Sequence, residues 1–242
     1  MKQVLLKVTE TRSVAANVYK TVLAGDVSGI TSPGQFVNLR IDGLYLRRPI
    51  SVCDLGKDTL TLVYKVVGKG TAAMSEAIVG DTFDVLTGLG NGYDLSLAGD
   101  APLLIGGGVG VPPLYYLAKK LTEMGIVPYI VLGFNRKEEV FFMREFEALG
   151  AKVTLATVDG SAGHKGFVTD VLPDEYTYFY ACGPEPMLKA VFKSTKTDGE
   201  FSFEERMGCG FGACMGCTCK TVTGNKRICK DGPVLKKGEI LW

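Results

Sequence analysis

The chain has 242 residues and a mass of 26.0 kDa, which suits one large domain or two small ones. Lys and Arg number 27 and Asp and Glu number 26, so the formal net charge is +1 and the charge balance does not favour a nucleic-acid partner. The proportions of hydrophobic residues (46%) and charged residues (22%) are typical of folded globular proteins. The single histidine, His164, excludes metal sites that need several imidazoles.

Neither a targeting segment nor a membrane span is expected. Lys7 interrupts the first apolar residues before a signal-peptide core could form. Residues 101–118 carry no charge, over nearly the length of a membrane span, but four glycines and three prolines interrupt them. A lipid-exposed helix tolerates such breaks poorly, because lipid cannot satisfy the freed backbone groups. We therefore expect a cytoplasmic protein with no membrane partner.

Residues 1–98 have the pattern of a small β-barrel. Short β-rich runs lie at 4–8, 18–22, 35–41, 60–66 and 82–86. Turns such as Ser32-Pro33-Gly34 separate these runs, and regular short strands with turn signals are typical of an antiparallel barrel. One helix is predicted to interrupt the barrel at residues 71–78, directly after Gly70.

Residues 99–200 change to alternating strands and helices. A buried strand at 102–105 is followed by a glycine loop and a helix through Leu121. Further strands are predicted at 127–132, 153–157 and 176–181, and they alternate with helices at 138–149, 168–172 and 185–193. This alternation predicts a parallel α/β sheet, and residues 201–242 remain as a third, cysteine-rich segment.

Five of the seven cysteines lie between residues 209 and 229. The odd number, without a secretory signal, favours metal ligation over disulfides. Cys209, Cys214 and Cys217 have the spacing C-x4-C-x2-C of plant-type [2Fe–2S] proteins, and Cys229 follows as the predicted fourth ligand. Glycines between the cysteines would let the loop wrap closely around a cluster.

Two alternatives to this ligand set stay open. One is that the cysteines bind zinc instead of an iron–sulfur cluster, although zinc sites favour two short cysteine pairs separated by a longer run. The other is Cys219, which lies two residues after Cys217 and points the same way if the segment is extended. Cys229 is preferred because a ligand from a distant segment would close the site.

Four short motifs have the residue types of nucleotide sites. The glycine loop 106–113, between a strand and a helix, can bind a pyrophosphate or form only a tight turn. The segment 46–51 offers a guanidinium and a hydroxyl, or is a basic edge strand in which Pro49 argues against a place in the middle of a sheet.

The other two motifs also allow a simpler interpretation. Residues 68–71 can bind a phosphate or begin an ordinary Thr-capped helix. Residues 181–184 join a strand to a helix at the usual ligand edge, where Cys182 can contact a bound ring or be a small buried hydrophobe.

The four motifs, in this order and with a terminal cysteine segment, resemble the ferredoxin-reductase-like flavoproteins. Residues 204–214 and 228–234 are similar to the iron–sulfur segment of the electron-transfer subunits of NAD-linked, type B dihydroorotate dehydrogenases. Residues 89–93, Leu-Gly-Asn-Gly-Tyr, also resemble that family. The departures are Thr87-Gly88 in place of Gly-Pro, Tyr93 in place of Phe, and Leu235 where Phe is common.

The resemblance implies a fold and a set of sites. The fold is a six-stranded antiparallel FAD-binding barrel (1–98), a parallel-sheet NAD-binding α/β domain (99–200) and a [2Fe–2S] segment (201–242). The residues implied for FAD are Arg48, Pro49, Ile50, Ser51, Val63, Tyr64, Lys65, Gly70 and Thr71. Those implied for NAD are Gly106, Gly107, Gly108, Gly110, Pro113, Cys182, Gly183 and Pro184. The cluster ligands are Cys209, Cys214, Cys217 and Cys229.

The function implied is electron transfer in pyrimidine biosynthesis. An FMN-containing partner oxidises dihydroorotate, and electrons pass through the [2Fe–2S] cluster and FAD to NAD⁺, in a heterotetramer of two subunit pairs. No catalytic acid or base is expected, since the cofactors carry the chemistry.

Three alternatives stay open: a subunit of a ferredoxin:NADP transhydrogenase or sulfur reductase, a stand-alone NADH-dependent reductase, and a zinc-binding adaptor. The choice between NAD and NADP is also open. Asn135, Arg136 and Lys137 follow the second strand of the sheet, where a 2′-phosphate could bind, although the family favours NAD.

Overall fold

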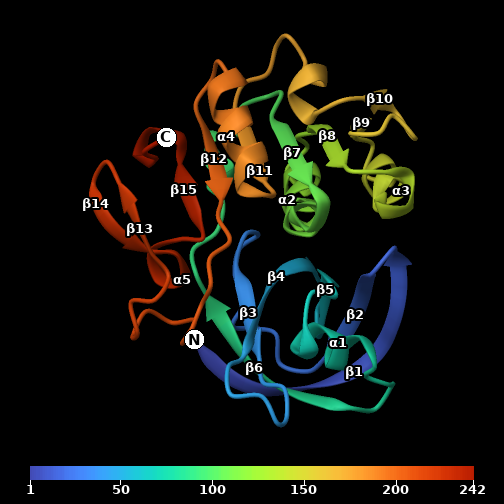
Figure 1. The fold of residues 1–242 in the computed structure, drawn as a ribbon, viewed down its shortest axis with the longest axis vertical. Helices are drawn as coiled ribbons and strands as arrows, with labels where there is room; N and C mark the ends of the chain where they lie inside the picture. Colours follow the sequence, from blue (N-terminus) through green and yellow to red (C-terminus); the bar gives the residue numbers. More distant parts are fainter.

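The computed structural model describes residues 1–242 and contains a closed barrel, a seven-stranded sheet and a two-stranded sheet (Figure 1). The barrel consists of β1 (Lys2–Ala15), β2 (Val18–Ala24), β3 (Phe36–Leu39), β4 (Arg48–Leu55), β5 (Thr59–Lys65) and β6 (Thr82–Leu89). Its strands run in the order β1-β2-β5-β4-β3-β6, and all pairs are antiparallel. The predicted six-stranded antiparallel barrel is therefore confirmed.

Alternation of side chains along each strand fills the barrel. On β5, Leu60, Leu62 and Tyr64 belong to the buried cluster inside the barrel, whereas Val63 packs outside it. Helix α1 (Lys69–Ser75) follows β5, beginning two residues earlier than predicted and ending three residues earlier. Its residue Met74 is fully buried in the same interior cluster.

The seven-stranded sheet lies beside the barrel, above it in Figure 1. Its strands are β7 (Leu103–Gly107), β8 (Tyr129–Phe134), β9 (Lys152–Thr157), β10 (His164–Lys165), β11 (Phe179–Cys182), β12 (Gly199–Ser202) and β15 (Val234–Lys236). The order is β10-β9-β8-β7-β11-β12-β15. All neighbours are parallel except β15, which the C-terminal segment adds antiparallel to β12.

Helix α2 (Val111–Glu123) lies between this sheet and the barrel (Figure 1). Its sheet-facing residues Leu114 and Leu117 are fully buried. From the same helix, Lys119 reaches Asp54 on β4 at 2.8 Å. The opposite side of the sheet is covered by α4 (Glu185–Ser194) and a single 3₁₀ turn, η4 (Val168–Val171). One helix thus serves both to cover the sheet and to fix the barrel against it.

The prediction of a helix at 138–149 is wrong over the first half of that range. The structure has a 3₁₀ turn, η3 (Lys137–Glu139), then residues 140–142 outside any helix or strand, and α3 only from Met143 to Ala148. Phe141 and Phe142 are both buried, and Phe142 takes a positive φ of 67°. Their adjacent rings pack edge-on against each other, and Phe141 also packs on Phe134. Burying two neighbouring aromatic side chains in one cluster outweighs the helical pattern of the sequence.

The C-terminal segment forms a hairpin, β13 (Thr218–Thr221) and β14 (Gly224–Arg227), then α5 (Ile228–Asp231) and β15. Trp242 closes the chain by packing on Phe192, Phe201 and Phe203, with ring centroids 5.5 Å apart in each case. The segment is therefore tied to the sheet by both a strand and an aromatic cluster. No helix of the structure has the length and apolarity that crossing a membrane requires.

Glu200 on β12 is a buried carboxyl group, 3% exposed. It accepts a hydrogen bond of 2.9 Å from the backbone N–H of Asp94, in the link between barrel and sheet. Its register neighbours are Tyr180 on β11 and Lys236 on β15. Burial raises the pKa of Glu200 to about 7, and the nearby Asp94 carboxylate contributes to the rise while the hydrogen bond from the Asp94 N–H opposes it. Glu200 therefore ionises near neutral pH, at a point where all three parts of the chain meet.

Replacing Glu200 by Gln is expected to stabilise the protein more at high pH than at low pH. The pKa of Glu200 is raised in the folded state from the ordinary 4.5 to about 7. The protonated carboxyl group therefore contributes its full share of the free energy of unfolding below pH 4.5, and this contribution is lost as the pH rises through 7. The Gln variant keeps an acceptor for the Asp94 N–H and has no charge to bury. Its gain in free energy of unfolding should be about 2 kcal/mol larger at pH 8 than at pH 5.5. Urea unfolding at the two pH values measures this difference, and equal gains at both would contradict it.

Candidate flavin, nicotinamide and iron–sulfur site

Strands β4 and β5 separate at one end of the barrel. They pair only between Val52–Leu55 and Leu60–Leu62. Before Val52, β4 pairs with β3 alone, and after Leu62, β5 pairs with β2 alone. The backbone groups along 48–51 and 63–65 that would join the two strands are therefore free for a ligand. Pro49 does lie within a strand of the barrel, which corrects the sequence-based expectation, but no β5 residue pairs with it on this open edge.

The side chain of Arg48 lies across Gly70 at the beginning of α1. A Cβ atom on Gly70 would be 2.1 Å from Arg48 Nε, so only glycine leaves room for the guanidinium here. The hydroxyl of Thr71 accepts hydrogen bonds from the backbone N–H groups of Val67 (3.0 Å) and Gly68 (3.3 Å) and thereby fixes the loop before the helix. Two motifs that the sequence separates by about twenty residues thus form one positively charged cradle, which suits a phosphate.

Residues 63–65 differ in the direction of their side chains. The Tyr64 ring lies inside the barrel, where its hydroxyl and that of Thr21 are 2.9 Å apart and burial raises the pKa of Tyr64 to about 12. Its side chain therefore points away from the open edge, and only its backbone is placed to meet a ligand. Val63 packs outside the barrel, and Lys65 Nζ lies 3.8 Å from Oε1 of Glu139. Ile50 and Ser51 are half-buried on the facing strand.

The glycine loop and the Cys182-Gly183-Pro184 motif are in contact at the carboxyl edge of the sheet. A Cβ on Gly110 would lie 2.3 Å from the carbonyl oxygen of Cys182, and a Cβ on Gly183 would lie 3.2 Å from Cα of Gly107. The loop passes through a 3₁₀ turn, η2 (Gly108–Gly110), into α2. Both prolines of the first turn of α2 are buried there, Pro113 among them. The structure thus brings together the two motifs predicted for the dinucleotide.

Cys182 itself is a neutral thiol. Burial raises its pKa to about 12, with a further rise from Glu204, whereas the hydroxyls of Ser202 and Tyr93 lower it. Ser202 is its register neighbour on β12. A thiol with such a pKa is not a nucleophile at neutral pH. Its place at the end of β11, beside the glycine loop, suits contact with a bound ring.

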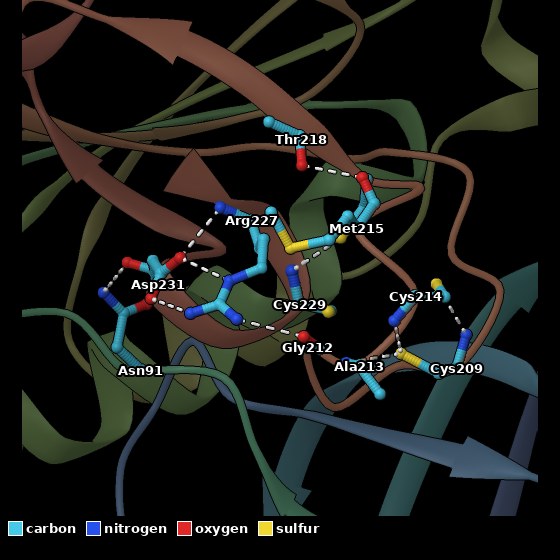
Figure 2. A network of polar contacts seen from close by, with 11 residues as sticks. Asn91, Cys209, Gly212, Ala213, Cys214, Met215, Thr218, Arg227, Cys229 and Asp231 are labelled. Atoms are coloured by element: carbon cyan, nitrogen blue, oxygen red, sulfur yellow. Dashed lines mark hydrogen bonds and ion pairs between the residues drawn. The ribbon is translucent and has the colours of Figure 1, made fainter. Parts of the chain in front are cut away.

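The four predicted cluster ligands are linked by hydrogen bonds as two pairs, and Figure 2 labels three of them, Cys209, Cys214 and Cys229. Cys209 Sγ accepts hydrogen bonds from the N–H groups of Ala213 (3.2 Å) and Cys214 (3.5 Å), and Cys214 Sγ accepts one from Cys209 (3.5 Å). In the second pair, Cys217 Sγ accepts a hydrogen bond of 3.4 Å from the N–H of Cys229. A [2Fe–2S] cluster has four thiolate ligands, so that two thiolates fall to each of its irons. The paired arrangement fits that requirement.

At Cys209 the backbone favours the thiolate. Burial raises the pKa of Cys209, but the N–H groups of Cys214, Phe211 and Ala213 more than offset it, and the pKa falls to about 6. The thiolate, which is the form that binds metal, is therefore favoured. No three His, Cys, Asp or Glu side chains gather around a single point to hold one metal ion.

Two residues that were not predicted as site residues hold the cysteine loop and the strand that follows it. Arg227 donates to the carbonyl oxygen of Gly212 (3.0 Å) and pairs with Asp231 (3.0 Å), as Figure 2 shows. Asn91 exchanges two hydrogen bonds with the backbone of Val234, at 2.8 and 3.0 Å. Asn91 lies in the segment 89–93 that the family resemblance covers, although no role was predicted for it; no sequence signal marks Arg227.

The loop also rests on the barrel. Asn38 on β3, 1% exposed, donates to the carbonyl oxygen of Cys209 at 3.3 Å. A Cβ on Gly210, where φ is +80°, would lie 2.4 Å from Asn38 Nδ2. Asn38 is opposite Pro49 in the β3–β4 register. The cysteine loop is therefore separated from the open edge of β4 by a single pair of strands.

Fold and site together define a class: an oxidoreductase with a ferredoxin-reductase-like barrel, a nucleotide-binding sheet and an iron–sulfur segment. Residues 204–241 match the family model of the iron–sulfur cluster binding domain of dihydroorotate dehydrogenase B, and residues 104–193 match that of the oxidoreductase NAD-binding domain. The chain is 46% identical to the dihydroorotate dehydrogenase B (NAD⁺) electron transfer subunit of Geobacillus sp. (strain WCH70), covering 100% of this chain and 99% of that protein. The chain belongs to this family of electron transfer subunits.

Other comparisons agree. The Fusobacterium nucleatum electron transfer subunit is 44% identical, over 96% of both chains. The structure of an NADH-dependent reduced ferredoxin–NADP oxidoreductase superposes with a TM-score of 0.89 at 31% identity, covering 100% of this chain and 91% of that one. The FAD/NAD-binding domain of a Vibrio cholerae nitric oxide dioxygenase shares the fold at 22% identity, with a TM-score of 0.70 over 81% of this chain. The family resemblance and fold class predicted from the sequence are confirmed.

Proposed function

We propose that this chain carries electrons from the oxidation of dihydroorotate to NAD⁺, as the flavin and iron–sulfur subunit of a pyrimidine-biosynthetic dehydrogenase. The observation that supports this most is that the predicted cluster, flavin and nucleotide sites lie on neighbouring elements of the fold. The cysteine loop rests on β3, β3 pairs with β4, and the open edge of β4 lies on the side of the barrel where α2 joins the nucleotide-binding sheet. The three predicted sites therefore lie on connected neighbouring elements of the fold.

The barrel residues fit FAD. Arg48, Gly70 and Thr71 would hold the pyrophosphate, and the free backbone of Pro49, Ile50, Ser51 and of Val63–Lys65 would meet the flavin ring. When bound, FAD supplies the ability to exchange electrons singly or as a hydride. The protein contributes binding and orientation.

The sheet residues fit NAD. Gly106, Gly107, Gly108 and Gly110 let the backbone approach a pyrophosphate, and α2 directs its N-terminus towards that place. Cys182, Gly183 and Pro184 would contact the nicotinamide end. Hydride transfer between two rings needs no general base, which agrees with the neutral thiol of Cys182 and the lone, exposed His164.

The cysteine pairs fit a [2Fe–2S] cluster with Cys209, Cys214, Cys217 and Cys229 as ligands. We place the parts at 1–98, 99–200 and 201–242, with β12 running across the second boundary. The partner would be an FMN-containing dihydroorotate dehydrogenase subunit, in a heterotetramer of two subunit pairs. The names of the relatives support a dehydrogenase partner through the words "electron transfer subunit".

A second candidate is the corresponding subunit of a ferredoxin:NADP transhydrogenase, favoured by the TM-score of 0.89 with such an enzyme. The two are separated by experiment. The tagged chain would be purified without oxygen from its source cells, together with its partner, and mixed with dihydroorotate in the absence of NAD⁺. Bleaching of the flavin and iron–sulfur absorbance, reversed by NAD⁺, is expected. Bleaching by NADH but not by dihydroorotate would contradict the proposal and favour the second candidate.

Arg48→Ala is expected to weaken FAD binding about tenfold, or about 1.4 kcal/mol, because the variant loses the guanidinium that lies over Gly70. The measurement is the FAD content of the purified protein and its retention during dialysis. Arg12→Ala is the matched control, since Arg12 is an exposed barrel residue that pairs only with Glu10. Equal flavin content in both variants would count against the assignment of Arg48.

A further inference from the structure

The loop after β8 lies at the ligand edge of the sheet. Gly133, near the end of β8, is the register neighbour of Gly107 in the glycine loop. The chain then continues through Asn135 and Arg136 into η3. In parallel sheets that bind dinucleotides, the end of the strand next to the glycine loop is where the adenosine ribose lies, and its 2′ position distinguishes NADP from NAD.

Two cations from different parts of the chain approach this place. Arg136 lies two residues after the end of β8 and its side chain is 59% exposed, and Lys65 ends the barrel strand β5. A ribose 2′-phosphate carries up to two negative charges and is normally bound by such side chains. Judged by these two residues alone, the site would be suited to NADP.

Glu139 places a negative charge beside these two cations. Its side chain is only 17% exposed, and its Oε1 lies 3.8 Å from Lys65 Nζ and 3.9 Å from Arg136 Nε. Its Oε2 accepts a hydrogen bond of 2.9 Å from Asn135 Nδ2. One carboxylate, fixed by a side-chain amide, thus faces both cations at once. The backbone holds η3 there too, since the carbonyl oxygen of Glu138 accepts from the N–H of Ala16 at 2.9 Å.

We propose that Glu139 makes this chain selective for NAD over NADP, by neutralising Arg136 and Lys65 and by repelling a ribose 2′-phosphate. The proposal rests on the proposed function, because it takes the edge beside the glycine loop as the adenosine site. Lys65 also couples the choice of nucleotide to the barrel, since the same lysine ends the strand that borders the flavin edge. A ligand that displaced Glu139 from Lys65 would have to leave a partly buried carboxylate without one of its two cations.

Glu139→Gln tests this directly. Gln retains an oxygen for the Asn135 amide and removes the charge. The affinities of the purified, flavin-loaded protein for ADP-ribose and for 2′-phospho-ADP-ribose would be measured by calorimetry, together with kcat/KM for NADH and NADPH. The ratio of affinities is expected to move about tenfold towards the 2′-phosphate. Glu138→Gln is the matched control, because Glu138 forms no ion pair with Arg136 or Lys65, and its ratio should stay within about twofold of wild type.

Arg136 provides a second test that does not depend on how Glu139→Gln folds, since Arg136 is largely exposed. Arg136→Ala alone should change the affinity ratio by less than about twofold, because Glu139 already neutralises that guanidinium. In the Glu139→Gln background the same substitution should abolish the gain.

Three outcomes would decide the matter. A tenfold loss of 2′-phosphate affinity in Arg136→Ala alone would show that Arg136 is a free phosphate ligand, and would overturn the proposal. An unchanged ratio in Glu139→Gln, with ADP-ribose still bound, would overturn it too and leave the proposed function standing. A wild-type protein that binds neither ADP-ribose nor NADH would instead contradict the proposed nucleotide site itself.

Discussion

Cys229→Ser is expected to remove the iron–sulfur cluster. Cys229 is buried on α5, and its N–H points to Cys217 Sγ at 3.4 Å, so it completes the second pair of sulfurs. With a serine there, one iron would keep a single thiolate, and the purified protein should retain less than about a tenth of its iron. Iron and acid-labile sulfide, with the visible absorbance and the electron paramagnetic resonance of the reduced protein, measure the loss.

Cys219→Ser is the matched control. Cys219 lies on β13 opposite Lys226, and none of the hydrogen bonds that link the four predicted ligands involves it. The cluster should survive in this variant with an unchanged spectrum. Loss of iron from Cys219→Ser, with iron retained in Cys229→Ser, would exchange the roles of the two residues. Flavin content should be normal in both variants, because neither cysteine is among the residues that would hold FAD.

Local features of the fold could be read from the sequence because their signals are local. Alternating β-rich runs predicted the barrel, and the spacing of Cys209, Cys214 and Cys217 predicted a cluster loop that the structure draws together. The ends of predicted elements differ from the observed ends by a few residues, as at helix α1, because hydrogen bonding sets them. The family resemblance was sufficient to order the three parts.

Features that depend on distant pairing could not be read in this way. The addition of β15 to β12 joins residues that are far apart in the sequence, and neither strand has a distinctive pattern. The broken helix before α3 follows from the burial of Phe141 and Phe142, which the helical spacing conceals. Likewise, the contact between Lys65 and Glu139 joins the barrel to the sheet, and only the fold reveals it. In the candidate site, the motifs were predicted but the residues that support them were not.

Gly110→Ala is expected to reduce kcat/KM for NADH about a hundredfold, or about 2.7 kcal/mol. The added Cβ would lie 2.3 Å from the Cys182 carbonyl oxygen, 2.4 Å from its carbon and 2.5 Å from the Gly183 nitrogen. All three are backbone atoms, so no side chain can rotate away, and the glycine loop must move apart from the Cys182-Gly183 segment. A displacement of that kind would separate the two motifs that together would bind the dinucleotide.

The flavin and iron spectra of Gly110→Ala should be normal, because Gly110 is not among the residues that would hold FAD or the cluster. Gly238→Ala is the control, since a Cβ there meets nothing within 4 Å and φ is not in the left-handed region. Stopped-flow reduction of the bound flavin by NADH separates the outcomes. A fast reduction in Gly110→Ala would mean that the loop tolerates the displacement and does not form the dinucleotide site. If reduction is slow at low NADH but normal at high NADH, the contact between loop and strand acts through NADH binding. If reduction stays slow at saturating NADH, the contact positions the nicotinamide for hydride transfer.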